Sequence, residues 1–155
     1  MIKNIDCMHW QWKNCPVAWQ GAYRGHNNTP IIILEAIASY NTWIWKSYFG
    51  IPGANNGLNV LARSDVFEDL LHGRTLPINY EINGNHYDME YYLADNIYPR
   101  YATILKSMKN LNTENERVFF RTQESVKNDV ERAFGILQAK FTIIRQPGRL
   151  WNEVH

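Results

Sequence analysis

The stretch Lys127-Asn-Asp-Val-Glu-Arg-Ala-Phe-Gly-Ile-Leu-Gln-Ala-Lys-Phe141 decides how this chain is interpreted. Apolar residues recur through it at steps of three and four, which predicts a helix with one apolar stripe: Val126, Val130, Ala133, Phe134, Leu137 and Phe141. At about 100° per residue, Asp129 lies on one shoulder of this stripe and Glu131 on the other. Helical geometry does not choose between them, and acids of this kind are most often solvated flank residues.

Two acids upstream make the helix more informative. Asp6 ends a short apolar run that contains Ile2 and Ile5, and Asp95 ends the run Tyr91-Tyr-Leu-Ala94. Carboxylates at two strand ends together with one on a late helix form an arrangement that can hold divalent metal ions. The sequence therefore predicts a shared acidic site built from distant parts of the chain.

Length and composition describe one folded domain. The chain has 155 residues, with 45% hydrophobic and 20% charged residues, which is typical of a globular domain with a sizeable core. No apolar run approaches the roughly 20 residues of a membrane span, and no secretory signal is visible. Two cysteines, Cys7 and Cys15, are too few for a disulfide framework and are predicted to be buried thiols.

Charge is unevenly distributed along the chain. The formal net charge is only +1, which does not by itself indicate a nucleic-acid-binding protein. Residues 1–95 carry six Lys/Arg against nine Asp/Glu, whereas residues 96–155 carry ten against six. A phosphate backbone, if one binds, is therefore expected to meet the second part.

Hydrophobic periodicity and turn signals give an order of elements. Strands are predicted first, with an antiparallel start to the sheet, then a helix, a hairpin around Asn83-Gly84-Asn85, one or two short strands and a long helix. Thr113 with Glu116 forms a capping-box pattern at the start of that helix. The predicted strands cover 2–7, 9–12, 31–38, 43–49, 78–82, 86–89, 91–95 and 103–105, and the predicted helices 58–71 and 113–139.

This order predicts an α/β chain of the α+β type, with a mixed sheet, helices packed on it and a small hairpin insertion. It is similar to an RNase H-like layout, in which catalytic acids lie on the first strand, the fourth strand and a late helix. We expect residues 1–155 to form a single domain. Because the first strand begins at the first residues, we also expect the natural protein to extend beyond this chain at its N-terminal end.

Five separated motifs resemble one family, and they occur in its order over nearly the whole chain. They are Ile5-Asp-Cys-Met-His-Trp10, Asn14-Cys-Pro-Val-Ala-Trp-Gln-Gly21, Gly50-Ile-Pro-Gly-Ala-Asn-Asn56, Tyr91-Tyr-Leu-Ala-Asp-Asn-Ile-Tyr-Pro99 and Asp129-Val-Glu-Arg-Ala-Phe-Gly135. This pattern resembles the plant branch of the PIF/Harbinger DDE transposases and the host proteins derived from them. The resemblance implies a triad of Asp6, Asp95 and Glu131, and so chooses Glu131 over Asp129. The 35 residues between the last two acids suit the spacing of such enzymes.

The resemblance also implies a chemistry and partners. Such a triad would hold two Mg²⁺ or Mn²⁺ ions for in-line attack on a DNA phosphodiester, first by water and later by a DNA 3′-hydroxyl. The resemblance implies that the protein binds transposon-end DNA together with a Myb-like DNA-binding partner, in the nucleus. It is compatible with an oligomeric protein and implies no role for a membrane. Lys127 and Arg132 are candidates to meet phosphates; surface salt links are an equally good interpretation.

Two functions remain open at this stage. The first is a metal-dependent endonuclease and strand-transfer core of a Harbinger-type transposase, as a fragment or decayed copy. The second is a host-adapted, non-catalytic protein-interaction or chromatin-associated module. An intact triad favours the first. Two departures from the family favour the second: Gly57 stands where the plant branch has an acidic residue, and the resemblance implies that the chain lacks the family's N-terminal helical region and stops short of its usual C-terminal end.

Overall fold

The computed structural model describes residues 3–55, 57–65, 68, 78–95, 97–106 and 112–149. The strands are β1 (Lys3–Gln11), β2 (Ile31–Ser39), β3 (Ile44–Pro52), β4 (Tyr80–Ile82), β5 (Asn85–Tyr87), β6 (Tyr92–Ala94) and β7 (Ile104–Lys106). The helices are α1 (Gln20–Tyr23), α2 (Gly57–Arg63), α4 (Glu114–Lys140) and α5 (Thr142–Arg145). This is a mixed α+β structure, as predicted.

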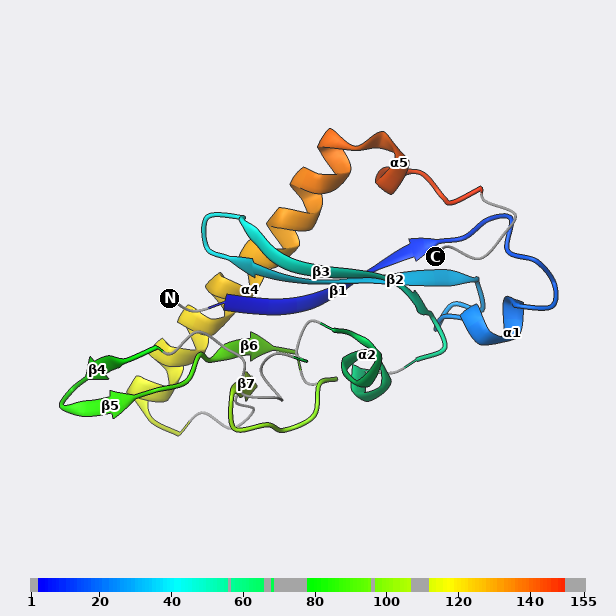
Figure 1. The fold of residues 1–155 in the computed structure, drawn as a ribbon. Coiled ribbons are helices and arrows are strands. Elements are labelled where there is room, and N and C mark those ends of the chain that lie inside the picture. The colour runs from blue at the N-terminus through cyan, green and yellow to red at the C-terminus, as the bar shows by residue number, and fades with distance from the viewer. Residues whose placement is uncertain are drawn as a thin grey trace.

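Five strands form one mixed sheet in the order β3-β2-β1-β6-β7. The antiparallel start is confirmed, since β1 pairs with β2 and β2 with β3 in that sense. The later strands β6 and β7 continue the sheet in parallel from β1. Figure 1 shows α4 and α5 on one face of the sheet and α2 on the other.

β1 is longer than predicted. The two segments expected at 2–7 and 9–12 form one strand, because its residues from Lys3 to Gln11 pair without interruption with β2. Sequence patterns split them because buried and exposed positions do not alternate regularly along it. β2 is buried at all nine positions, as expected of a central strand covered on both faces.

Local turn and cap chemistry formed as the sequence predicted. Asn83 and Gly84 both have positive φ, 51° and 81°, and join β4 to β5, which is the geometry that favours Asn-Gly in a two-residue hairpin. At the start of α4, Thr113 accepts from the backbone N–H of Glu116, whose side chain accepts from Thr113 N–H. This capping box fixes where the helix begins.

The apolar stripe of α4 packs on the sheet, with one exception. Leu34, Ala36 and Ala38 of β2 contact the buried residues of the helix, which are Val130, Ala133 and Phe134. Phe141 was predicted to extend this stripe, but it lies at the C-terminal cap and is 53% exposed. The prediction was wrong there because the helix ends at Lys140, so helical spacing no longer places Phe141 over the sheet.

Three further features bear on the predictions. Part of the helix predicted at 58–71 forms α2, and the remainder lies mostly outside the described residues. The one-turn helix α1 lies between β1 and β2, where neither a strand nor a helix was predicted. Cys7 and Cys15 are free thiols, and Trp12 is fully buried in a cluster with Trp10 and Tyr23.

Candidate functional site: an acidic cluster where β1 and β6 stop pairing

Strand register places Asp6 and Asp95 side by side. Ile5 of β1 pairs with Ala94 of β6 in the parallel sense, so the next residue of each strand occupies a neighbouring position. β6 ends at Ala94, and Asp95 is its first residue beyond the sheet. Both acids are partly exposed there, which allows ligands to reach them.

The carboxylate of Asp6 reports the electrostatics of the site. Burial raises its pKa most, and a 2.8 Å hydrogen bond from the backbone N–H of Cys7 lowers it. Positive Lys127 lowers this pKa further, and the negative charges of Asp95 and Glu131 raise it. Asp6 thus lies within electrostatic reach of both other predicted acids and of one lysine, in the way that clustered carboxylates disfavour each other's ionisation.

Lys127 supplies the positive charge of this cluster. Its Nζ lies 3.3 Å from Oδ1 of Asp95, and the two side chains are 39% and 38% exposed. Lys127 stands one helical turn before Glu131 on α4, so the flank of the helix that carries both residues faces the end of β6. A single lysine here offsets part of the repulsion among three carboxylates.

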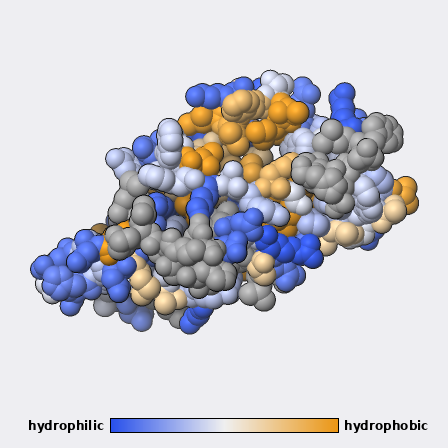
Figure 2. Space-filling model, viewed as in Figure 1, coloured by the Kyte–Doolittle hydropathy of each residue, from blue (hydrophilic) through white to orange (hydrophobic). Residues whose placement is uncertain are grey.

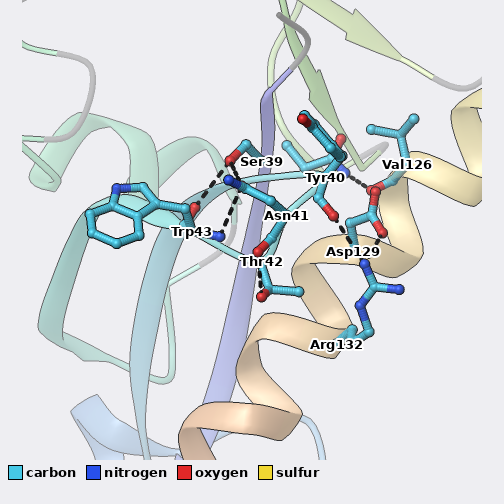
Figure 3. Close-up of polar contacts among 9 residues, drawn as sticks. Ser39, Tyr40, Asn41, Thr42, Trp43, Val126, Asp129 and Arg132 are labelled. Carbon is cyan, nitrogen blue, oxygen red and sulfur yellow. Dashed lines mark hydrogen bonds and ion pairs between the residues drawn. The ribbon is translucent and has the colours of Figure 1, made fainter.

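The opposite flank of α4 carries Asp129 and Arg132. Nη2 of Arg132 donates to Oδ1 of Asp129 at 2.8 Å and to the backbone oxygen of Tyr40 at 3.0 Å. Figure 3 shows this group beside the turn between β2 and β3, where Asn41 organises the turn through hydrogen bonds with Ser39 and Trp43. Asp129 and Arg132 therefore attach the helix to that turn.

Asn4, a buried residue of β1, attaches the sheet to the middle of α4. Its side chain is 2% exposed and its Nδ2 donates to the backbone oxygen of Val126. Further along, the side-chain amide of Gln138 donates to the sulfur of Met8. These contacts from β1 to both halves of the helix position Lys127 and Glu131 relative to Asp6.

The donor chemistry of the cluster suits a hard cation, but its geometry is not a closed coordination shell. Carboxylate oxygens are the ligands that Mg²⁺ and Mn²⁺ prefer. Among the described residues, no three His, Cys, Asp or Glu side chains are grouped closely enough to hold a metal ion. The cation that contacts Asp95 is instead Lys127. To bind a metal ion at this cluster, the Lys127–Asp95 ion pair would have to open. Glu131 would also have to approach Asp6 and Asp95.

A cavity of about 500 Å³ opens next to Asp6 and Asp95. Apart from Asp6 and Asp95, its polar lining consists of Cys7, His9, His26 and Asn55. His26 was not predicted to belong to the site, because it lies in a loop rich in Asn and Gly where no periodicity applies. Asn55 lies in the motif at residues 50–56, which gave it no chemical role. Only the fold brings these loops to the site.

On the face of the sheet opposite α4, a polar chain links β1, the loop after β6 and β2. Sγ of Cys7 lies 3.0 Å from the hydroxyl of Tyr98, and that hydroxyl donates to Oε1 of Glu35 at 3.2 Å. Cys7 follows Asp6, and Tyr98 comes three residues after Asp95. Burial raises the pKa of Glu35 and raises that of the Cys7 thiol to about 12. Sequence analysis missed Glu35, although a lone acid within the apolar run at 31–38 is a signal for such a network.

Comparison with protein families identifies the class to which this fold and site belong. The chain matches the family described as plant transposon protein over residues 1–155. Because the match covers the whole chain, this protein belongs to the plant transposon protein family, which indicates a transposase-related function. Neither a curated protein nor a solved structure matches it. In the part of the chain that the structure describes, no helix combines the length and apolarity needed to cross a membrane.

Proposed function

We propose that this chain is the catalytic core of a Harbinger-type transposase with an RNase H-like fold, in which Asp6, Asp95 and Glu131 form a DDE triad. One observation carries this proposal: the β1–β6 register places Asp6 beside Asp95, and both Asp95 and Glu131 act on the pKa of Asp6. Membership of the plant transposon protein family supports a role in DNA transposition. Two acids carried by neighbouring strands and one acid on a helix are the arrangement expected of this chemistry.

The three carboxylates are the groups that would hold Mg²⁺ or Mn²⁺. When bound, a metal pair would polarise a phosphodiester and lower the pKa of water or of a DNA 3′-hydroxyl for in-line attack. Asp6 is fixed within β1, Asp95 directly follows the neighbouring strand β6, and the N–H of Cys7 orients Asp6. Glu131 is exposed on α4 and supplies the movable third carboxylate.

The two basic residues of α4 have different roles in this proposal. Lys127 neutralises the acids in the described state and, with Nζ partly exposed, contacts a substrate phosphate once Asp95 takes up a cation. Arg132 is 59% exposed, so that its other N–H groups can meet the DNA backbone while Nη2 remains attached to Asp129. Both are phosphate contacts and carry no sequence information.

DNA binding by this chain alone should be weak. Its net charge is +1, and affinity for DNA scales with the number of phosphates neutralised. We therefore propose that transposon-end DNA is gripped together with a Myb-like partner protein, in the nucleus, and that assembly of several copies is compatible with this role. Phosphoryl transfer depends mainly on positioning, so the core depends on that grip.

A second candidate function is a host-adapted, non-catalytic protein-interaction module. An apolar hollow of about 360 Å³ lies between the sheet and the end of the helical layer, and its lining includes Trp10, Phe49 and Ile143. Phe49 and Ile143 are 41% and 72% exposed. Figure 2 shows hydrophobic residues gathered over α5 and the end of α4 and again over the sheet. Exposed apolar patches of this kind mark protein contacts.

Thermal melting with and without Mn²⁺ separates the two functions. A cation at 100 times its Kd that binds only the folded chain adds about 2.7 kcal/mol, at about 2–4 °C per kcal/mol for a chain of this size. We expect this stabilisation in the parent and in the control Asp129→Asn, and its loss in Asp95→Ala. Equal stabilisation of Asp95→Ala would place the metal elsewhere, and no stabilisation of the parent would favour the interaction module.

Cleavage is tested separately with supercoiled plasmid and Mn²⁺ at low ionic strength. We expect little nicking by the chain alone and an increase when a DNA-binding domain is fused to it. Glu131→Gln should abolish that increase, whereas Asp129→Asn should retain it. Nicking that both variants retain would exclude Glu131 as the third acid.

A further inference from the structure

β1 has an open edge beside the acidic cluster. At one end of this edge Ile5 pairs with β6, and at the other the backbone oxygen of Gln11 accepts from the N–H of Gly148 at 2.7 Å. Between these two points, β1 pairs with β2 alone among the described segments. The strand therefore carries its side chains from Asp6 towards Gln11 past a gap in the sheet.

Two adjoining hollows follow this stretch of β1. The first, about 500 Å³, contains Asp6 and Asp95, and the second, about 390 Å³, contains Gln11, Asn27 and Thr29. His9 and His26 line both hollows. The two hollows therefore meet at the histidines and form one groove, here called the histidine groove, that leads away from the acids.

The far wall of the histidine groove is a preformed loop. Arg24 and Pro30 form a bridge, and the N–H of Gly25 donates to the backbone oxygen of Thr29 at 2.9 Å. Gly25 packs closely there, because an added Cβ would lie 2.6 Å from Cδ1 of Ile31 and would force that side chain to shift. The N–H of Trp12 donates to the oxygen of Pro30 at 2.8 Å, which attaches this loop to the end of β1.

The chemistry of the histidine groove suits phosphodiester oxygens. Beyond Asp6, Asp95 and Cys7 at its acidic end, its polar side chains are imidazoles, amides and a hydroxyl, all of which donate hydrogen bonds to DNA backbones. Burial lowers the pKa of His9, and nearby His26 lowers it further, so the two rings lie close together. A neutral imidazole such as that of His9 donates a hydrogen bond through one ring nitrogen. A metal site is a poorer fit, because the described residues provide no third close ligand.

We propose that the histidine groove binds the phosphodiester backbone of the nucleic-acid strand that enters the acidic site, with His9 and His26 contacting one of its phosphates. From Asp6 to His9 the strand rises about 10 Å at roughly 3.3 Å per residue. This distance equals about three steps of a stacked nucleotide strand at roughly 3.4 Å each. The inference rests on the proposed function, and it specifies on which side of the acids the substrate strand continues.

Binding of a fluorescein-labelled single-stranded oligonucleotide in EDTA, followed by anisotropy at low salt, tests this inference without metal. We expect His26→Ala and His9→Gln each to weaken binding about threefold to tenfold. The control His86→Ala lies on the exposed β4–β5 hairpin and should leave binding unchanged. Asp95→Asn should bind slightly more tightly, because it removes a negative charge near the entering strand.

Three outcomes would overturn the proposal. Unchanged affinity in both histidine variants, with parental melting temperatures, would show that the strand lies elsewhere. An equal loss in His86→Ala would indicate nonspecific charge effects. If Zn²⁺ or Mn²⁺ stabilised the parent but not His26→Ala, the pair would be a metal site instead. Each result is independent of whether Asp95→Ala loses its Mn²⁺-dependent stabilisation, so failure of the groove and failure of the triad remain distinguishable.

Discussion

The two flanks of α4 carry the same combination of charges and use it differently. On one flank, Asp129 and Arg132 form an ion pair of 2.8 Å within the helix and contact Tyr40 on the neighbouring turn. On the other, Lys127 reaches 3.3 Å from Asp95, which follows a strand 32 residues earlier in the chain. The first pair is local and attaches the helix, whereas the second joins the helix to an acidic cluster. Neighbours, and not residue type, decide which acid is available for chemistry.

The largest effect should come from the residue between the two flanks. Val130 is fully buried against the sheet, so Val130→Ala removes apolar contacts and leaves a small cavity. We expect the free energy of unfolding to fall by about 2 kcal/mol, measured by urea denaturation. The control Val118→Ala, at a position 53% exposed, should change stability by less than about 0.5 kcal/mol.

Loosening the helix in this way should affect both flanks together. Mn²⁺ should raise the melting temperature of Val130→Ala less than that of the parent, because the helix no longer holds Glu131 firmly beside Asp6 and Asp95. If the variant lost stability yet bound Mn²⁺ as tightly as the parent, the position of α4 would not control the acidic cluster.

The next largest effect should come from Lys127→Met, which removes the cation of one flank only. Because the Lys127–Asp95 pair must open before a metal can bind Asp95, we expect Mn²⁺ to bind about fivefold more tightly, equivalent to about 1 kcal/mol. DNA binding should weaken in the same variant, since one phosphate contact is lost. Isothermal titration with Mn²⁺ measures the first effect and anisotropy the second.

Arg132→Met is the matched control for this experiment. It removes a cation from the flank that faces Tyr40 and should leave Mn²⁺ affinity unchanged. If both variants raised Mn²⁺ affinity equally, the effect would reflect overall charge, and the two flanks would not differ.

The features that could be predicted from the sequence are those set by neighbouring residues, such as tight turns and helix starts. Asn83-Gly84 specified a tight hairpin and Thr113 with Glu116 specified the start of α4, because each acts over a few residues. The antiparallel arrangement of the first three strands and the position of Asp95 directly after a strand also followed from apolar runs and breaks. The predicted strand end at Asp6 was wrong, because β1 continues through Asp6 to Gln11.

The remaining features depend on tertiary contacts that no local pattern encodes. Helical geometry placed Asp129 and Glu131 on equivalent shoulders, and only the packing of α4 distinguishes their surroundings. Likewise, the Lys127–Asp95 pair requires α4 and β6 to meet. His26 reaches the site only because its loop folds back onto β1. The family resemblance, which selected Glu131, supplied information that periodicity could not.

A smaller effect, on the pH dependence of stability, should come from Glu35, which is fully buried in β2 whereas the acids beside α4 are at least partly exposed. Burial raises the pKa of Glu35, while hydrogen bonds from Ser64 and Tyr98 partly lower it. A carboxyl with a raised folded-state pKa contributes stability that is fully present below its unfolded value near 4.5 and is lost as the pH rises through the folded value. Glu35→Gln should therefore match the parent near pH 4 and be the more stable protein at pH 7 to 8.

Melting curves across this pH range, with Tyr98→Phe as the companion variant, check the assignment. Tyr98→Phe removes a hydroxyl that hydrogen-bonds Glu35, so its stability should fall more steeply than the parent's as the pH rises. A parent and a Glu35→Gln variant with parallel pH profiles would show that other groups set the pH dependence.

The smallest effect should come from Arg132→Ala, which breaks the local pair on the flank facing the β2–β3 turn. The side chain of Arg132 is 59% exposed and its partner Asp129 lies three residues away on the same helix, a type of pair worth about 0.3–0.5 kcal/mol. Its hydrogen bond to the oxygen of Tyr40 adds an attachment to the turn, so hydrogen exchange should quicken at residues 40–43 while the free energy of unfolding changes little. Asp129→Asn keeps an oxygen that can accept from Arg132 and should leave exchange in that turn close to the parent's. Slower exchange in Arg132→Ala, or a loss of stability as large as that of Val130→Ala, would contradict the view that this flank only attaches the helix.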